Sequence, residues 1–215
     1  MANLDGWMDT LRTRLPGADD NVLNLELRNT IREFCTQSGA FLKRVELALK
    51  QDKNEYNLNP QPDGNVLWVH QIYSAKGFEY VLVDDERLAR VGMNRAYCPS
   101  PGMIRISPTP DADADKEDGL VVWVGMVPNF NITNLTVPDE FETAWFDHIL
   151  DGALFRLHSQ HKRPWTNPMN AQYHGRRFRN GMAQARDITR RRFSDADSSF
   201  HFPAWGNLPR ERSRW

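Results

Sequence analysis

The chain has little of what membrane proteins, secreted scaffolds and most enzymes need. Its 215 residues contain two cysteines, Cys35 and Cys98, which provide neither a disulfide framework nor a CxxC pair. This cysteine usage is typical of a reducing cytosol. No apolar run approaches the roughly 20 residues that span a bilayer, so we expect no contact with a membrane. The N-terminus lacks a basic region followed by an apolar stretch, which argues against a secretory signal.

Motifs for catalysis and metal binding are missing as well. There is no phosphate-binding glycine loop, no GxSxG elbow and no HExxH. Residues 111–119 begin like a calcium loop, but Lys116 and Val122 occupy the sixth and twelfth positions, where an EF-hand needs Gly and Glu. We interpret this stretch as an exposed acidic loop. Three histidines lack a Cys, Asp or Glu at ligand spacing and predict no zinc site: His158, His161 and His174.

The sequence therefore predicts no catalytic residue, no metal and no cofactor. A dispersed active site is the alternative, and it would require a concave pocket that contains perturbed titratable groups.

Charge is distributed very unevenly along the chain. Residues 156–215 contain thirteen Lys and Arg against four Asp and Glu, whereas residues 1–155 contain fourteen against twenty-four. The net charges of the two parts are thus +9 and −10. A chain divided in this way is better suited to assembly with partners than to acting as a self-contained enzyme.

Apolar residues at three- and four-residue steps predict a first long helix over residues 21–50. Asp19 or Asp20 can cap its start, and a gap in the apolar pattern at Ser38-Gly39 can bend it or admit another backbone. The residues that define the pattern are Leu27, Ile31, Phe34, Phe41, Val45 and Ala48.

Residues 56–131 have a different pattern, of β-branched and aromatic runs bounded by Gly, Pro and Asp. We expect a small antiparallel sheet or sandwich of about four to six strands. Its predicted strands are GNVLWVHQIY, FEYVLVD, MIRIS and GLVVWVGMV.

Helical periodicity returns near Thr136, which we predict as an N-cap with Pro138 at an early helical position. Gly152 in this helix would permit close packing against a neighbour. Asn167 is expected to cap the last helix, with Pro168 at its first position. The predicted core positions of the earlier of these two helices are Phe141, Trp145 and Ile149.

These patterns together predict an α+β fold. One N-terminal and two C-terminal long helices form a helical bundle, into which a small antiparallel β subdomain is inserted, and an extended C-terminal tail follows. The expected boundaries are residues 1–55 with 132–192 for the helical domain, 56–131 for the β subdomain and 193–215 for the tail.

The last helix is striped with arginine. On a projection of 100° per residue, its apolar and small residues fall within an arc of about 120°. These residues are Ala171, Phe178, Gly181, Met182, Ala185 and Ile188. The opposite side carries a basic face made of Arg176, Arg179, Arg186 and Arg190. We favour a contact between this face and the acidic surface of another subunit, because like charges at this spacing repel each other. A solvated surface and a nucleic-acid contact are the alternatives.

The tail combines aromatic residues with Ser, Asp, Pro and Arg. Phe, Trp and Arg are the residue types that anchor interfaces, so we favour a tail that docks into a partner's grooves. A disordered terminus and a tail folded back on its own domain are the alternatives. The candidate anchors are Phe193, Phe200, Phe202, Trp205 and Trp215.

Three stretches of the chain carry a family resemblance: LRNTIREFCTQS at Leu27–Ser38, ILDGALFRL at Ile149–Leu157, and KRPWTNP at Lys162–Pro168, followed by Tyr173 and the basic helix. They resemble the head-to-tail adaptor (connector) proteins of tailed bacteriophages. The strand-rich middle of the chain fits the same family, so the resemblance covers residues 21–192.

The resemblance implies a structural virion protein in the neck, between capsid and tail. Such adaptors form a ring, commonly a dodecamer, beneath the portal protein, with helices in the ring body and a β-rich part projecting toward the tail or nozzle protein. A C-terminal extension typically clamps the portal. The genome would pass through without sequence-specific binding, and the subunits would assemble in the host cytoplasm. The alternative function is nucleic-acid binding by the arginine-rich last helix.

Overall fold

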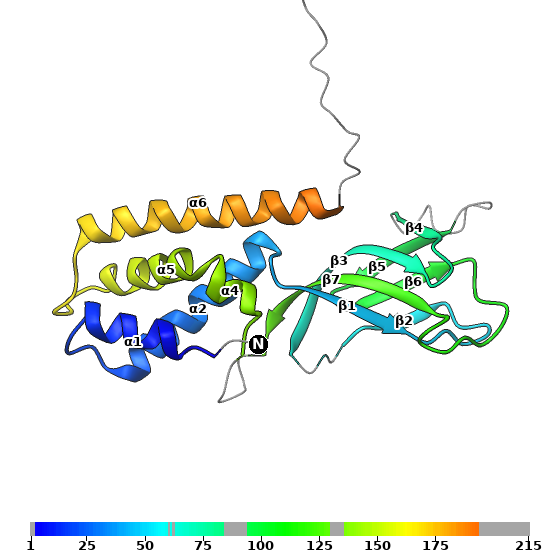
Figure 1. Cartoon of the computed structure of the whole chain (residues 1–215), viewed down its shortest axis with the longest axis horizontal. Helices are drawn as coiled ribbons and strands as arrows, with labels where there is room; N and C mark the ends of the chain where they lie inside the picture. The colour runs from blue at the N-terminus through cyan, green and yellow to red at the C-terminus, as the bar shows by residue number, and fades with distance from the viewer. Residues whose placement is uncertain (1–2, 60, 62, 84–93, 130–135, 194–215) are drawn as a thin grey trace, which may run out of the picture.

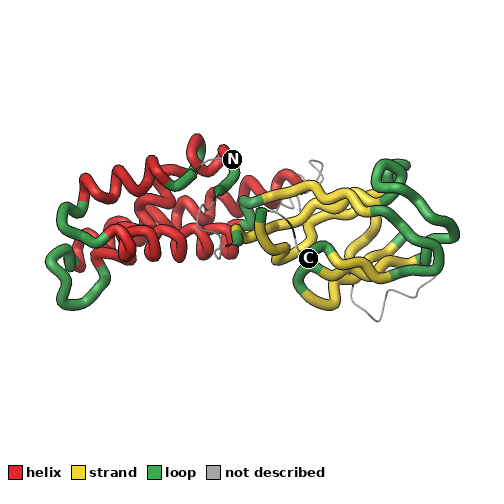
Figure 2. The backbone as a smooth tube through the Cα atoms, turned by 90° about the horizontal axis from the view of Figure 1, so that it is seen from below, coloured by secondary structure: helices red, strands yellow, loops and turns green. Residues whose placement is uncertain are grey.

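The computed structural model describes residues 3–59, 61, 63–83, 94–129 and 136–193. Helices gather at one end of an elongated molecule and strands at the other (Figures 1 and 2). The helices are α1 (Asp5–Arg14), α2 (Asp20–Ser38), α4 (Asp139–Thr143), α5 (Phe146–His158) and α6 (Pro168–Phe193). The predicted α+β class is confirmed, although the described residues form five α-helices rather than three.

The strands form one curled seven-stranded sheet in the order β1-β7-β3-β4-β5-β6-β2. Neighbouring strands are antiparallel except for β4 and β5, which pair in parallel over two residues each. The strand bounds are Leu42–Leu47 for β1, Glu55–Asn57 for β2, Gly64–Ser74 for β3, Glu79–Leu82 for β4, Arg95–Ser100 for β5, Met103–Ser107 for β6 and Leu120–Pro128 for β7. The four predicted strands correspond to β3, β4, β6 and β7.

The first long helix is shorter than predicted. Asp19 caps α2 by accepting a hydrogen bond from the Asn21 backbone N–H at 2.7 Å, but the helix ends at Ser38 rather than Lys50. Gly39 has a φ of 69°, the left-handed conformation that glycine adopts readily at a helix C-terminus. Residues 42–47, predicted as helix, instead form β1 and pair with β7. β1 therefore belongs to the sheet, although residues 1–55 were expected to belong to the helical domain.

The second predicted helix is divided into α4 and α5. Pro138, not Thr136, occupies the N-cap of α4, and the helical path is interrupted at Ala144 and Trp145. The interruption places the Trp145 ring 5.7 Å from that of Phe34 and lets Phe146 stack on Trp7 at 5.0 Å. The two consecutive aromatic residues at the break thus contact different helices, Trp145 α2 and Phe146 α1.

The core of the helical part is centred on Phe34 of α2. Its ring contacts those of Phe141 and Trp145, and lies 6.4 Å from Phe178 of α6. Gly152 of α5 faces both α2 and α6, because a Cβ at this position would meet Thr30 and the Phe178 ring. The close packing predicted at Gly152 is thus confirmed, and α2, α5 and α6 meet at this residue.

We expect Gly152→Ala to lower the free energy of unfolding by about 1–3 kcal/mol, because the methyl group would force Thr30 or Phe178 to move. Urea titration monitored by circular dichroism measures the change. Gly6→Ala in α1 is the matched control. A Cβ there would meet Phe146 only at an ordinary 3.5 Å, so alanine should be neutral or stabilise by up to about 1 kcal/mol. Equal effects of the two substitutions would contradict the close packing at Gly152.

Candidate functional site

The sequence of α6 specifies both its start and its buried side. The Asn167 side chain accepts a hydrogen bond from the Asn170 backbone N–H at 3.1 Å, and Pro168 is the first helical residue, as predicted. Small residues let α5 approach closely: a Cβ on Gly175 would lie 2.9 Å from the Phe155 ring, and one on Gly181 would collide with His148. The buried residues are Ala171, Gly175, Phe178, Gly181, Ala185 and Thr189.

The predicted buried arc is wrong at Ile188, whose exposed fraction is 43%. Thr189 takes the buried place, with an exposed fraction of 4%. On the same projection of 100° per residue, Thr189 falls at the angle of Ala171, within the buried arc, whereas Ile188 falls at the boundary of the predicted arc. Ile188 therefore lies at the edge of the buried stripe.

The arginines of α6 divide into two groups. Three make ion pairs: Arg177 with Asp151 at 2.8 Å, Arg191 with Asp187 at 2.7 Å and Arg192 with Glu140 at 2.8 Å. The other four are the residues of the predicted basic face, Arg176, Arg179, Arg186 and Arg190. All four are exposed, and none forms an ion pair with a residue that the structure describes.

A buried carboxylate attaches α6 to α5. Asp151 has an exposed fraction of 3% and lies 2.7 Å from His174 Nδ1 and 2.8 Å from Arg177 Nε. The Tyr173 hydroxyl, which accepts from Arg177, and the Asp151 carboxylate raise the pKa of Arg177. His158 stacks on His174 with ring centroids 5.8 Å apart. The sequence signal for this site was Asp151 itself, an acidic residue within the apolar stretch ILDGALF.

The basic face borders a groove between α2 and α6. One hollow of about 280 Å³ is lined by residues that include Gln37, Arg179, Arg186 and Arg190. A second, of about 270 Å³, continues past Gly39 to the sheet and shares three of these residues. We call these two hollows together the cationic groove. Its cationic wall comes from α6 and its other wall from the end of α2.

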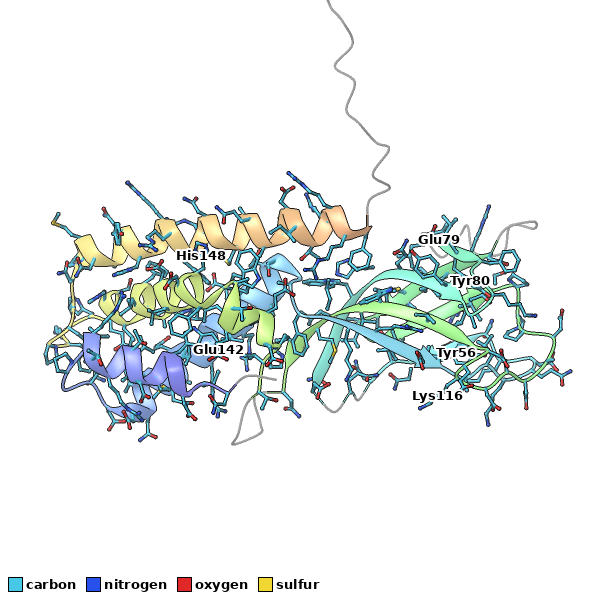
Figure 3. The ribbon with its side chains drawn as sticks, in the orientation of Figure 1. Tyr56, Glu79, Tyr80, Lys116, Glu142 and His148 are labelled. Atoms are coloured by element: carbon cyan, nitrogen blue, oxygen red, sulfur yellow. The ribbon has the colours of Figure 1, made fainter. Side chains whose placement is uncertain are left out.

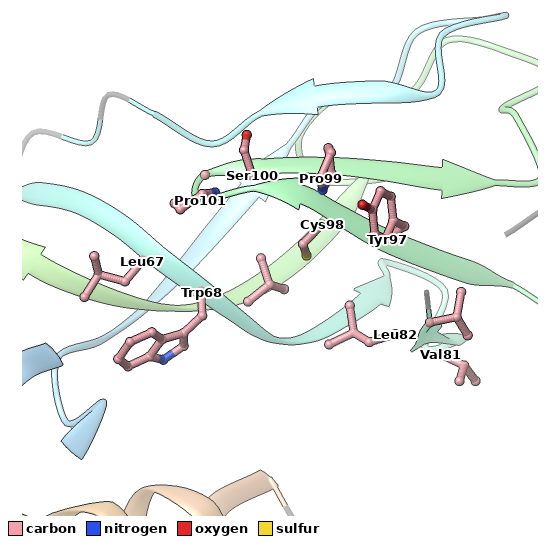
Figure 4. Close-up of a pocket in the computed structure, with 12 residues that line it drawn as sticks. Leu67, Trp68, Val81, Leu82, Tyr97, Cys98, Pro99, Ser100 and Pro101 are labelled. Atoms are coloured by element: carbon pink, nitrogen blue, oxygen red, sulfur yellow. The ribbon is translucent and has the colours of Figure 1, made fainter. Parts of the chain in front are cut away.

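Where this groove ends, Trp68 of β3 connects the helices to the sheet. A Cβ on Gly39 would lie 3.2 Å from the indole, and one on Gly125 would collide with it. The indole Nε1–H donates a hydrogen bond to His70 Nε2 at 2.8 Å. Figure 4 shows Trp68 extending from β3 toward α2 and α6. Its neighbours on the sheet surround an apolar hollow of about 770 Å³ lined by β3, β4 and β5.

Phe193, predicted as the first aromatic residue of the tail, is the last residue of α6. Its ring stacks on His70 at 4.7 Å with an interplanar angle of 8°, and lies 6.1 Å from Trp123. The other predicted tail anchors lie outside the described residues: Phe200, Phe202, Trp205 and Trp215. Sequence reasoning did not find the partners of Phe193, His70 of β3 and Trp123 of β7. Both strands were predicted from the sequence, but their contact with the last helix was not.

The acidic stretch that begins like a calcium loop is a surface loop of the sheet. Residues 111–118 form an exposed loop between β6 and β7, with a bridge between Leu49 and Ala114. No group of three or more potential metal ligands occurs among the residues that the structure describes. Within the same residues, no helix is long and apolar enough to cross a membrane.

We expect acid to weaken the contact around His70. Burial lowers the pKa of His70, so the unfolded chain takes up a proton, near its ordinary pKa of about 6.5, before the folded chain does. Stability is therefore lost as the pH falls through this range. His70→Phe cannot titrate and preserves a ring for Phe193. When the pH is lowered from about 7.5 to about 5.5, the unfolding free energy of wild type, measured in urea, should fall more than that of the variant. A pH-independent difference would refute this role of His70.

Comparison with known protein families identifies the chain. Residues 2–199 match the family described as SU10 adaptor protein. No curated protein matches the chain. The family match spans the helices, the sheet and the basic face of α6, and it confirms the resemblance to head-to-tail adaptors. The chain therefore belongs to the SU10 adaptor protein family, a family of phage head-to-tail adaptors with a structural role in the virion.

Proposed function

We propose that this protein forms a ring between the portal and the tail of a bacteriophage and docks to the portal through its C-terminal tail. The observation that carries the proposal is the family match over residues 2–199. In this role the protein catalyses no reaction and needs no cofactor. It acts by binding the portal, its own copies and the tail or nozzle protein.

The proposed ring, of about twelve subunits, follows the adaptor pattern. The helical part forms the ring body, and the sheet projects toward the tail, while the genome passes through without sequence-specific binding. Assembly takes place in the host cytoplasm before the particle is complete. The elongated shape, with helices at one end and strands at the other, supports this division (Figure 1).

The basic face of α6 is proposed as a contact between neighbouring subunits. Like charges at three- and four-residue spacing destabilise an isolated helix by a few tenths of a kcal/mol per pair. Arg176, Arg179, Arg186 and Arg190 are not neutralised by described residues of their own subunit. A carboxylate surface on another subunit would neutralise them. A heterologous contact of this kind closes into a ring when the rotation between subunits allows it.

Portal docking predicts a specific effect of truncation. A chain that ends at Phe193 keeps the stacking on His70, so it should unfold at the same temperature as the full chain. It should lose binding to purified portal rings, measured by co-sedimentation. A chain that ends at Asn207 is the matched control, because it lacks Trp215 but keeps Phe200, Phe202 and Trp205. Normal portal binding by the chain that ends at Phe193 would refute docking through the tail.

Nucleic-acid binding is the second candidate, because four exposed arginines without ion pairs could instead contact phosphates. It predicts affinity for plain duplex DNA that falls steeply with salt and is abolished by Arg176→Glu, Arg179→Glu and Arg186→Glu together. The adaptor function predicts that wild type and this variant bind duplex equally weakly. Fluorescence anisotropy at two salt concentrations separates the two.

A further inference from the structure

The edge of the helical part formed by α1 and α4 is acidic. Asp5 and Asp9 of α1 and Glu142 of α4 are exposed, and the side chain of Asp9 is 74% exposed. A Glu142 oxygen lies 4.0 Å from the position that a Cβ would take on Gly6, so Glu142 lies beside the first turn of α1, the helix that carries Asp5 and Asp9. We call Asp5, Asp9 and Glu142 the acidic edge.

Arg12 belongs to the same surface but does not neutralise it. It pairs with both Asp9 and Asp20, at 2.8 Å and 2.9 Å, and these carboxylates raise its pKa while it lowers the pKa of Asp20. One guanidinium thus serves two carboxylates. With Asp20 included, this surface has four exposed carboxylates against the cations Arg12 and Arg14 of α1, so it keeps an acidic excess.

The acidic edge and the basic face lie on opposite sides of the helical part. α1 packs on α2 and α5, and α6 packs on the same two helices. Figure 1 shows α6 along one side of this layer and α1 along the other. Figure 3 shows Glu142 on the side of α1, and His148 lying beneath α6. A surface and its electrostatic complement on opposite sides are what a repeating head-to-tail contact requires.

We propose that the cationic groove and basic face of one subunit receive the acidic edge, Asp5, Asp9 and Glu142, of a second copy of this chain. This deepens the proposed function, on which it rests, by naming the surface that contacts the basic face. The occupant is a second copy because the chain itself carries the complementary charge on the opposite side. Binding would offset part of the charge of the four arginines, which form no ion pair with described residues of their own subunit.

The size of the surfaces makes each contact weak. α6 has 26 residues, so its outward face measures about 39 Å by about 11 Å, or roughly 400 Å². A stable interface of standard size buries about 800 Å² per partner. One such contact should hold subunits together only at high concentration, and salt should weaken it further because the charges are exposed. Closing the ring gives every subunit two contacts and stabilises them together.

Reversal of charge on each surface tests the pairing directly. Arg179→Glu/Arg186→Glu makes both sides acidic, and Asp5→Lys/Asp9→Lys makes both sides basic. Sedimentation velocity at low salt and rising protein concentration measures self-association of each full-length chain. The matched controls change the net charge equally at the far tip of the sheet: Lys76→Glu/Lys116→Glu and Asp111→Lys/Asp115→Lys, all at exposed positions. Circular dichroism checks that each variant is folded.

We expect wild type and both controls to self-associate at low salt, and each reversed variant to stay monomeric. An equimolar mixture of the two reversed variants should associate again, because every contact then joins opposite charges. The chain that carries all four reversals should also regain association. Wild type that remains monomeric at low salt, reversed variants that associate like wild type, or a mixture that does not associate would each overturn the pairing.

Portal binding separates failure of this inference from failure of the proposed function. Arg179→Glu/Arg186→Glu retains the C-terminal tail, so single subunits should still bind portal rings. If reversed variants associate normally and wild type binds portals, only the pairing of surfaces is wrong. If wild type does not bind portals, the adaptor function itself fails.

Discussion

The meeting of α2, α5 and α6 at Gly152 determines where every exposed arginine of the last helix points. Phe178 contacts the position that a larger residue at Gly152 would fill, and its ring is also near Phe34 in the centre of the core. Because interiors are packed as densely as organic crystals, this contact fixes the rotation of α6 about its own axis. The basic face points outward because the opposite stripe of small residues must point inward.

Some arginines of α6 pair with carboxylates of other helices, and others point to solvent. Arg177 faces the buried carboxylate of Asp151, and removing one partner of such a pair would leave the other desolvated and unpaired. Arg192 reaches Glu140 on α4. These two pairs serve the fold, whereas Arg179 and Arg186 form no ion pair with any residue that the structure describes. The same residue type thus has a structural role on one side of the helix and is free for intermolecular contacts on the other.

Local chemistry in the sequence predicted some features well and others poorly. The helix caps depend on residues two or three positions away: Asn167 was predicted, and Asp19 was one of two candidates for its helix. Close packing at Gly152 was also predicted, but not that its partners would be Thr30 and Phe178. Residues 42–47 were misread because Phe41 and Val45 continue a helical spacing by coincidence. Gly39 in its left-handed conformation had already ended the helix.

Contacts between distant segments were beyond the reach of local patterns. β5 contains Pro99 and was not predicted, since its pairing with β6 and β4 depends on tertiary structure. The stacking of Phe193 on His70 joins residues more than 120 positions apart. The sequence predicted which side of α6 is basic, but not that its last residue rests on the sheet.

The stacking of Phe193 on His70 links the proposed ring contact to the proposed portal contact. Arg192 and Phe193 attach the end of α6 both to α4 and to the sheet, so the tail begins at a point that is fixed relative to both parts. A binding segment that starts from a fixed point loses less freedom on docking than one that starts from a loose end. The basic face lies on the same rigid helix, within the preceding turns. Neighbouring subunits aligned through α6 would therefore present their tails at regular positions, and docking of one tail would favour docking of the next.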